Sequence, residues 1–135
     1  MANTIRLEVV TPERLVYSQD VNMVIARATD GDIGILPGHA PLIAGLNIAP
    51  LRIKLDDTEQ QLAVSGGFIE VTPEKITVLA ATAETAEEID AKRAEEAKER
   101  AEGRLKSGEN FDQARAEAAL QRALVRLRVV EFLKK

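Results

Sequence analysis

The sequence predicts a β + α protein: an N-terminal antiparallel β-sandwich or barrel of about ten short strands, followed by a C-terminal antiparallel two-helix hairpin. Through the first part of the chain, glycine and proline turn signals recur about every 8–12 residues between short alternating runs. The rest of the chain contains no proline and is rich in alanine and charge. No helical pattern of about ten residues separates the strands, so a parallel βαβ architecture is not expected. We therefore expect two domains, residues 1–84 and residues 85–135.

Strands are expected where apolar side chains alternate with polar ones, the period of a half-buried strand, or where a short apolar run lies between turn signals. These segments are residues 5–9, 15–17, 21–25, 33–36, 42–46, 51–55, 62–64, 68–71 and 76–78. Asp30-Gly31 predicts a hairpin, because both central positions of a tight turn favour positive φ. Two prolines stiffen the loop at residues 37–41. We expect Ser65-Gly66-Gly67 to form a tight bend at a strand end, because no helix follows it.

The C-terminal hairpin is expected to begin at Thr85, because Glu88 three residues later completes a capping box. The break S-G-E-N at residues 107–110 ends the first helix, and Asn110 is expected to cap the second. Apolar residues of the second helix form a heptad-like seam at Ala116, Leu120, Ala123, Leu127 and Val130. At about 25 cal/mol per Å² such an alanine-rich seam stabilises weakly, so the hairpin should be able to open.

Composition excludes several classes of function. The chain has no cysteine, which excludes disulfides, thiolate metal sites and cysteine catalysis. No apolar run approaches the roughly 18–20 residues of a membrane span, and the N-terminus has no signal-peptide pattern, so we expect an intracellular soluble protein. Residues 1–84 hold 6 Lys+Arg against 11 Asp+Glu, whereas residues 85–135 hold 12 against 11. The acidic chain is not expected to bind nucleic acid, while its basic tail suits an acidic partner surface or a phosphate.

Signals of catalysis or of a metal site are missing from the sequence. The single histidine, His39, lies in the proline-bounded loop, where a structural or surface role is the usual one. Phosphate-binding loop, nucleophile-elbow and H-E-x-x-H motifs do not occur. We therefore expect no catalytic residue and no metal ligand.

Two groups of charged residues allow more than one interpretation. Asp90 and Arg93, three residues apart, form either a surface ion pair worth under roughly 1 kcal/mol or part of a ligand site. Arg115, Arg122 and Arg126 share a face of the second helix. They form a solvated stripe or, if the helices fold back on each other, part of the stripe approaches Arg93 and forms a site for a polyphosphate. Spacing alone leaves both interpretations open.

Four segments resemble the epsilon-subunit family of bacterial F-type ATP synthases, in order and spacing: V-V-T-P-E-R-L-V-Y, D-G-D-I-G-I-L-P-G-H-A-P-L, S-G-G-F-I-E-V and I-D-A-K-R-A. The resemblance implies a non-catalytic subunit of the central rotor stalk, which helps couple proton flow to ATP synthesis. It also implies contacts with the gamma subunit and the membrane ring of c subunits, and hence a peripheral position on the cytoplasmic face of the cell membrane. The resemblance assigns Asp32 and His39 to the c-ring contact; their alternative role is that of turn residues.

The family's C-terminal hairpin is a regulator, and the resemblance implies the same role here. Extended, such a hairpin reaches the alpha and beta subunits of the catalytic head and blocks ATP hydrolysis; folded, it lies on the sandwich and in some members binds ATP. The positions that match the nucleotide site are Glu84, Ile89, Asp90, Arg93, Ala94, Arg122 and Arg126. ATP is thus expected as a regulatory ligand, with no obligatory cofactor. The alternatives are a free-standing nucleotide-binding sensor and a static structural adaptor.

Overall fold

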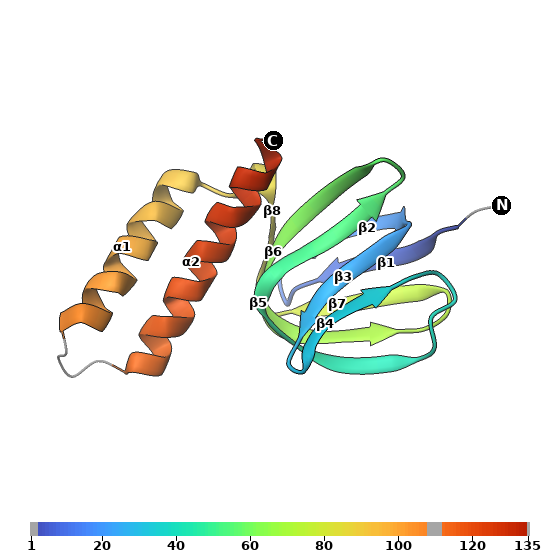
Figure 1. The fold of residues 1–135 in the computed structure, drawn as a ribbon, viewed down its shortest axis with the longest axis horizontal. Helices are drawn as coiled ribbons and strands as arrows, with labels where there is room; N and C mark the ends of the chain where they lie inside the picture. Colours follow the sequence, from blue (N-terminus) through green and yellow to red (C-terminus); the bar gives the residue numbers. More distant parts are fainter. Residues whose placement is uncertain (1–2, 108–111, 135) are drawn as a thin grey trace.

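The computed structural model describes residues 3–107 and 112–134, and its architecture is a β-sandwich with two helices packed beside it (Figure 1). The strands are β1 (Ile5–Val10), β2 (Leu15–Val21), β3 (Met23–Ala28), β4 (Gly31–Ile35), β5 (Leu42–Leu55), β6 (Thr58–Val71), β7 (Lys75–Ala80) and β8 (Ala83–Thr85). A 3-10 turn, η1 (Ala86–Glu88), leads to the helices α1 (Ala91–Ser107) and α2 (Gln113–Leu133). The predicted fold class is confirmed.

The described strands number eight because β5 and β6 each join two of the predicted segments into 14 residues. They form one long antiparallel hairpin, paired from Leu42 with Val71 to Leu55 with Thr58. The sequence predicted that the glycine pair at 66–67 ends a strand, and this is wrong: β6 continues through both glycines. There β6 exchanges its partner β8 for β7 while it stays paired with β5.

Gly67 makes this exchange of partners possible. Its φ is 115°, a conformation that residues with a side chain rarely adopt. A Cβ placed on Gly67 would lie 2.1 Å from the Leu79 carbonyl oxygen, which is part of the backbone of β7. Only glycine therefore allows β6 and β7 to approach this closely.

The sheet follows the order β2-β1-β7-β6-β5-β3-β4, with β8 paired to β6. All of its pairs are antiparallel except β1 with β7, which is parallel. The β3–β4 hairpin forms as predicted, although Ala28 pairs with Gly31 and the turn is therefore centred on Thr29-Asp30. In the described strands the fully buried side chains are aliphatic: Leu7, Val9, Val21, Val24, Ile35, Ile53, Ile69, Ile76 and Val78.

Helix α2 lies between the sandwich and α1, and the two helices are antiparallel (Figure 1). Val125 and Val129 of α2 are buried in a cluster with Ala63 of β6 and Ile89. These two valines lie outside the predicted heptad seam, because they face the sheet rather than the other helix. The described residues that α1 buries are only Ala94 and Ala101, so α1 contributes little apolar burial.

Both helix starts differ from the prediction. Thr85 and Glu88 do interact, since the Thr85 N–H donates to Glu88 Oε1 at 3.0 Å, but this contact closes η1 only. Helix α1 begins after Asp90, whose Oδ1 accepts from the Arg93 N–H at 3.0 Å. The N-cap of α2 is Asp112. Asn110, predicted as that cap, lies outside the described residues together with the rest of the S-G-E-N break after position 107.

Candidate functional site

An ion pair joins the end of the sheet to the middle of α2. The Nε of Arg126 lies 2.5 Å from Oε1 of Glu84, and about 30% of each side chain is exposed (30% and 31%). Glu84 belongs to β8 and pairs across the sheet with Ala63, so its position is set by backbone hydrogen bonds. Arg126 lies one residue after Val125, which the apolar cluster holds against the sheet. The pair is therefore fixed on both sides and fastens α2 to β8.

Arg122 borders the same groove one helical turn before Arg126. The groove is lined by Ile48, Ala63, Val64, Ser65, Thr82, Glu84, Arg122, Val125 and Arg126. Arg122 has no ion-pair partner among residues 3–107 and 112–134. The enclosed volume is only about 10 Å³, so a ligand at this groove would lie over its mouth. The structure thus brings together three of the predicted nucleotide-binding residues, Glu84, Arg122 and Arg126.

The other four predicted residues surround the start of α1. Ile89 and Ala94 are buried, and Ile89 belongs to the cluster that holds Val125. The carboxylate of Asp90 caps the helix by accepting from the Arg93 backbone N–H. The Arg93 guanidinium is exposed and has no salt-bridge partner within the described part of the chain. Ile89 links this end of α1 to the groove, while the Asp90–Arg93 contact is a helix cap and not a side-chain ion pair.

Arg115 does not join the other two arginines of the predicted stripe. It lies in the first turn of α2, 11 positions before Arg126, which at 1.5 Å per residue corresponds to about 16 Å along the axis. Its backbone N–H donates to the capping carboxylate of Asp112. A three-arginine site is therefore not formed on this face.

Asp32 lies near the start of β4, and His39 lies four residues beyond its end. Asp32 is an exposed residue whose Oδ1 accepts from Nε of Arg27 at 2.8 Å, and this hydrogen bond lowers the pKa of Asp32. His39 lies in the loop after β4, where its backbone N–H donates to the Leu36 carbonyl at 3.2 Å. Since β4 alone spans about 13 Å at 3.3 Å per residue, the two side chains do not contact each other.

A patch of exposed apolar side chains was not predicted from the sequence. Ile43, Phe68 and Leu79 are 71%, 61% and 54% exposed on the adjacent strands β5, β6 and β7. Phe68 pairs directly with Leu79, and its other neighbour Gly45 lies two residues from Ile43. The signal was present in S-G-G-F-I-E-V, because burial of Ile69 and Val71 turns Phe68 to the opposite face.

In the described part of the chain, no three His, Cys, Asp or Glu side chains lie close enough to hold a metal ion. Neither described helix has the length and hydropathy that a membrane span requires.

The chain matches two family models that follow one another in the order of the sandwich and the helices. Residues 4–86 match the beta-sandwich domain of the ATP synthase delta/epsilon chain, and residues 87–131 match its long alpha-helix domain. The ATP synthase epsilon chain of Priestia megaterium is 54% identical over 79% of this chain and 80% of its own. That of Alkalihalophilus pseudofirmus is 52% identical over 78% and 79%.

A solved structure shares the fold across the whole chain. It comes from the mitochondrial ATP synthase of Euglena gracilis, a cryo-EM structure of OSCP, F1 and the c-ring, with a TM-score of 0.79. The likeness covers 100% of this chain and 84% of that one at 22% identity. The chain belongs to the ATP synthase delta/epsilon family, as a non-catalytic accessory subunit of the complex.

Proposed function

We propose that this chain is a central-stalk subunit that couples proton translocation to ATP synthesis and restrains ATP hydrolysis. In this proposal the sandwich, residues 1–84, contacts the gamma subunit and the c-ring, and residues 85–135 form the regulatory arm. The subunit then lies peripherally at the cytoplasmic face of the membrane. Support comes from the epsilon-chain relatives and from the Euglena likeness, whose assembly contains F1 and a c-ring.

The patch of Ile43, Phe68 and Leu79 supports the contact with gamma. Three large apolar side chains on neighbouring strands, each more than half exposed, form the kind of surface that a partner protein covers. Asp32 and His39 are the proposed c-ring contacts, and their separation along β4 requires two contact points rather than one.

Phe68→Ser tests the gamma contact. The side chain is exposed, so the substitution should leave the melting temperature unchanged and weaken capture by a purified gamma subunit at least tenfold. Leu36→Ser is the matched control, because Leu36 is similarly exposed at 55% and lies outside the patch. Equal capture of wild type and both variants would contradict the assignment.

The observation that carries the regulatory proposal is the way α2 is fastened. Its contact with the sandwich combines a small apolar cluster with the Glu84–Arg126 ion pair, and α1 adds mostly alanine. An attachment of this kind can open without unfolding the sandwich, because the core of the sandwich is separate. We propose that the opened hairpin extends to the alpha and beta subunits of the catalytic head and blocks hydrolysis.

ATP is the proposed regulatory ligand of the folded hairpin, with no obligatory cofactor. Arg122 and Arg93 carry guanidiniums without salt-bridge partners in the described residues, and such groups pair well with phosphate oxygens. Glu84 and Asp90 supply acceptors for the donors of adenosine. Ile89, Ala94 and Arg126 hold the start of α1 and helix α2 in their relative positions. If ATP binds only the folded form, ATP at about 100 times its Kd raises the folded-to-extended ratio about a hundredfold.

Calorimetric titration with ATP tests this site. Arg122→Ala should weaken binding at least tenfold, whereas Arg128→Ala, on the same helix but outside the groove, should not. Absence of heat and of any thermal shift with the wild-type chain would remove ATP from the proposal.

Truncation tests the inhibitory role. A chain ending at Asp90 keeps β8 and η1 and loses both helices, so the sheet stays complete. Assembled with the catalytic head, it should raise the rate of ATP hydrolysis relative to the full chain. An unchanged rate would support a static adaptor, and failure to co-purify with rotor subunits would support a free-standing sensor.

A further inference from the structure

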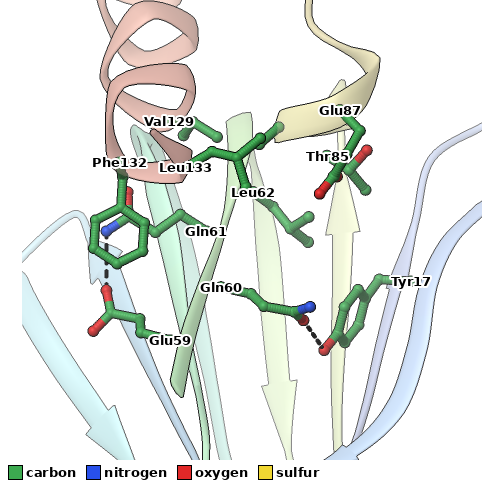
Figure 2. Close-up of a pocket in the computed structure, with 11 residues that line it drawn as sticks. Tyr17, Glu59, Gln60, Gln61, Leu62, Thr85, Glu87, Val129, Phe132 and Leu133 are labelled. Atoms are coloured by element: carbon green, nitrogen blue, oxygen red, sulfur yellow. Dashed lines mark hydrogen bonds between the residues drawn. The ribbon is translucent and has the colours of Figure 1, made fainter. Parts of the chain in front are cut away.

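A second cavity lies at the C-terminal end of α2 (Figure 2). Its volume is about 440 Å³, within the range of small-molecule sites. It is lined by Tyr17, Glu59, Gln60, Gln61, Leu62, Thr85, Ala86, Glu87, Val129, Phe132 and Leu133. Neither Arg122 nor Arg126 lines it, so its ligand differs from the proposed nucleotide.

The walls of this cavity combine apolar with polar side chains and come from both parts of the molecule. Val129, Phe132 and Leu133 project from α2, while Leu62 projects from β6 beneath them (Figure 2). Leu133 is 53% exposed, so the cavity opens to solvent at the end of the helix. A ligand that fills it touches α2 and the sheet together.

The polar groups at the rim favour a ligand that carries a hydrogen-bond donor or a positive charge. Among the residues that line the cavity there is no lysine or arginine, but there are two carboxylates. Glu59 is already bonded to Arg52 and Lys54, with N–O distances of 2.9 and 3.2 Å. Glu87 is exposed and has no hydrogen-bond or ion-pair partner within residues 3–107 and 112–134. The Glu87 carboxylate is thus free to accept a hydrogen bond from a ligand.

Tyr17 lies on the side of the cavity opposite Glu59 and Phe132 (Figure 2). Its hydroxyl donates to Gln60 Oε1 at 2.8 Å, which holds the ring against the rim (Figure 2). Burial raises the pKa of Tyr17, so this wall is partly shielded from water. Charge interactions close to such a wall are stronger than in bulk solvent.

We propose that this cavity binds a small primary ammonium group carried on an apolar, aromatic body, with Glu87 as the counter-ion. The body fills the space between Phe132, Leu133 and Ala86, above the buried Leu62 and Val129, and the ammonium donates to the Glu87 carboxylate. Because the walls come from α2 and from the sheet, the ligand binds only while α2 lies on the sandwich. Occupancy therefore holds α2 in place, whether or not a nucleotide binds the arginine groove.

A charge series on one apolar body tests the proposal. The probes are 4-(4-biphenylyl)butylamine, the corresponding alcohol and the corresponding carboxylate, titrated by NMR into the full chain without nucleotide. We expect saturable shifts at the amides of Leu62, Ala86 and Val129, with the amine at least fivefold tighter than the alcohol and the carboxylate weakest. The amine should also slow hydrogen exchange of α2 amides. Equal affinity for the three probes, or shifts elsewhere in the chain, would overturn the proposal.

Two variants with matched controls identify the groups responsible. Glu87→Gln should abolish the preference for the amine and preserve binding of the alcohol, whereas Glu74→Gln, in the turn before β7, should change neither. Leu133→Ser should weaken the binding of the amine and of the alcohol severalfold, whereas Leu36→Ser should not. All four positions are exposed, so the fold is retained. A preference for the amine that survives in Glu87→Gln would refute the role of this carboxylate.

Discussion

Val129→Ala is the sharpest test of a separately opening helical hairpin. Val129 is fully buried between α2 and the sheet, in a cluster whose buried members are Ala63, Ile89, Val125 and Val129 itself. The substitution removes two methyl groups, about 1.6 kcal/mol at 0.8 kcal/mol per buried carbon. At 1.4 kcal/mol per factor of ten, the equilibrium between attached and detached α2 should shift about fifteenfold towards the detached form.

Hydrogen exchange measures this shift amide by amide. In Val129→Ala the amides of α2 should exchange about fifteenfold faster, while those of β1 and β7 keep their protection. Val9→Ala is the matched control, because Val9 is equally buried but belongs to the core of the sandwich. It should lower the melting temperature without selectively accelerating α2. If Val129→Ala accelerates sandwich and helix amides alike, α2 does not open independently and the regulatory proposal loses its physical basis.

The remaining predictions concern stability. Gly67→Ala should destabilise the chain by more than about 2 kcal/mol in thermal unfolding, because its Cβ meets backbone, whereas Gly103→Ala, with open space around it in α1, should stabilise by up to about 1 kcal/mol. The pKa of Glu59 is lowered to about 2, first by its hydrogen bond from Arg52. Its stabilising contribution, on the order of 2–3 kcal/mol, should therefore be present above pH 4.5 and be lost as the pH falls towards 2. Urea unfolding should show this loss in wild type and not in Glu59→Gln. Glu84→Gln should weaken the attachment of α2 to the sheet by about 1 kcal/mol. A double-mutant cycle with Arg126→Met should show that most of this loss comes from the Glu84–Arg126 interaction.

Features that depend on near neighbours in the chain could be predicted from the sequence. Alternation and short apolar runs between turn signals located seven of the eight described strands, and Asp30-Gly31 located the β3–β4 hairpin to within one residue. The contact of Thr85 with Glu88 was also predicted, although it closes a 3-10 turn instead of starting α1. Such features are encoded by dihedral preferences and by hydrogen bonds over three or four positions, which a local pattern contains.

Features that depend on distant segments required the folded molecule. Glu84 and Arg126 are 42 positions apart, so no spacing rule identifies them as an ion pair. The β6 strand continues past its glycines because β5, on the other side, remains paired through the bend.

Sequence alone predicted a weakly packed helical hairpin. The tertiary structure showed which residues of α2 attach the hairpin to the sheet. The heptad-like spacing describes one face of α2, but Val125 and Val129 on the other face bind it to the sheet. A helix has several faces with apolar side chains, and its own sequence does not say which neighbour each face will meet. That choice is made by the sheet, whose β6 and β8 place Ala63 and Glu84 opposite α2.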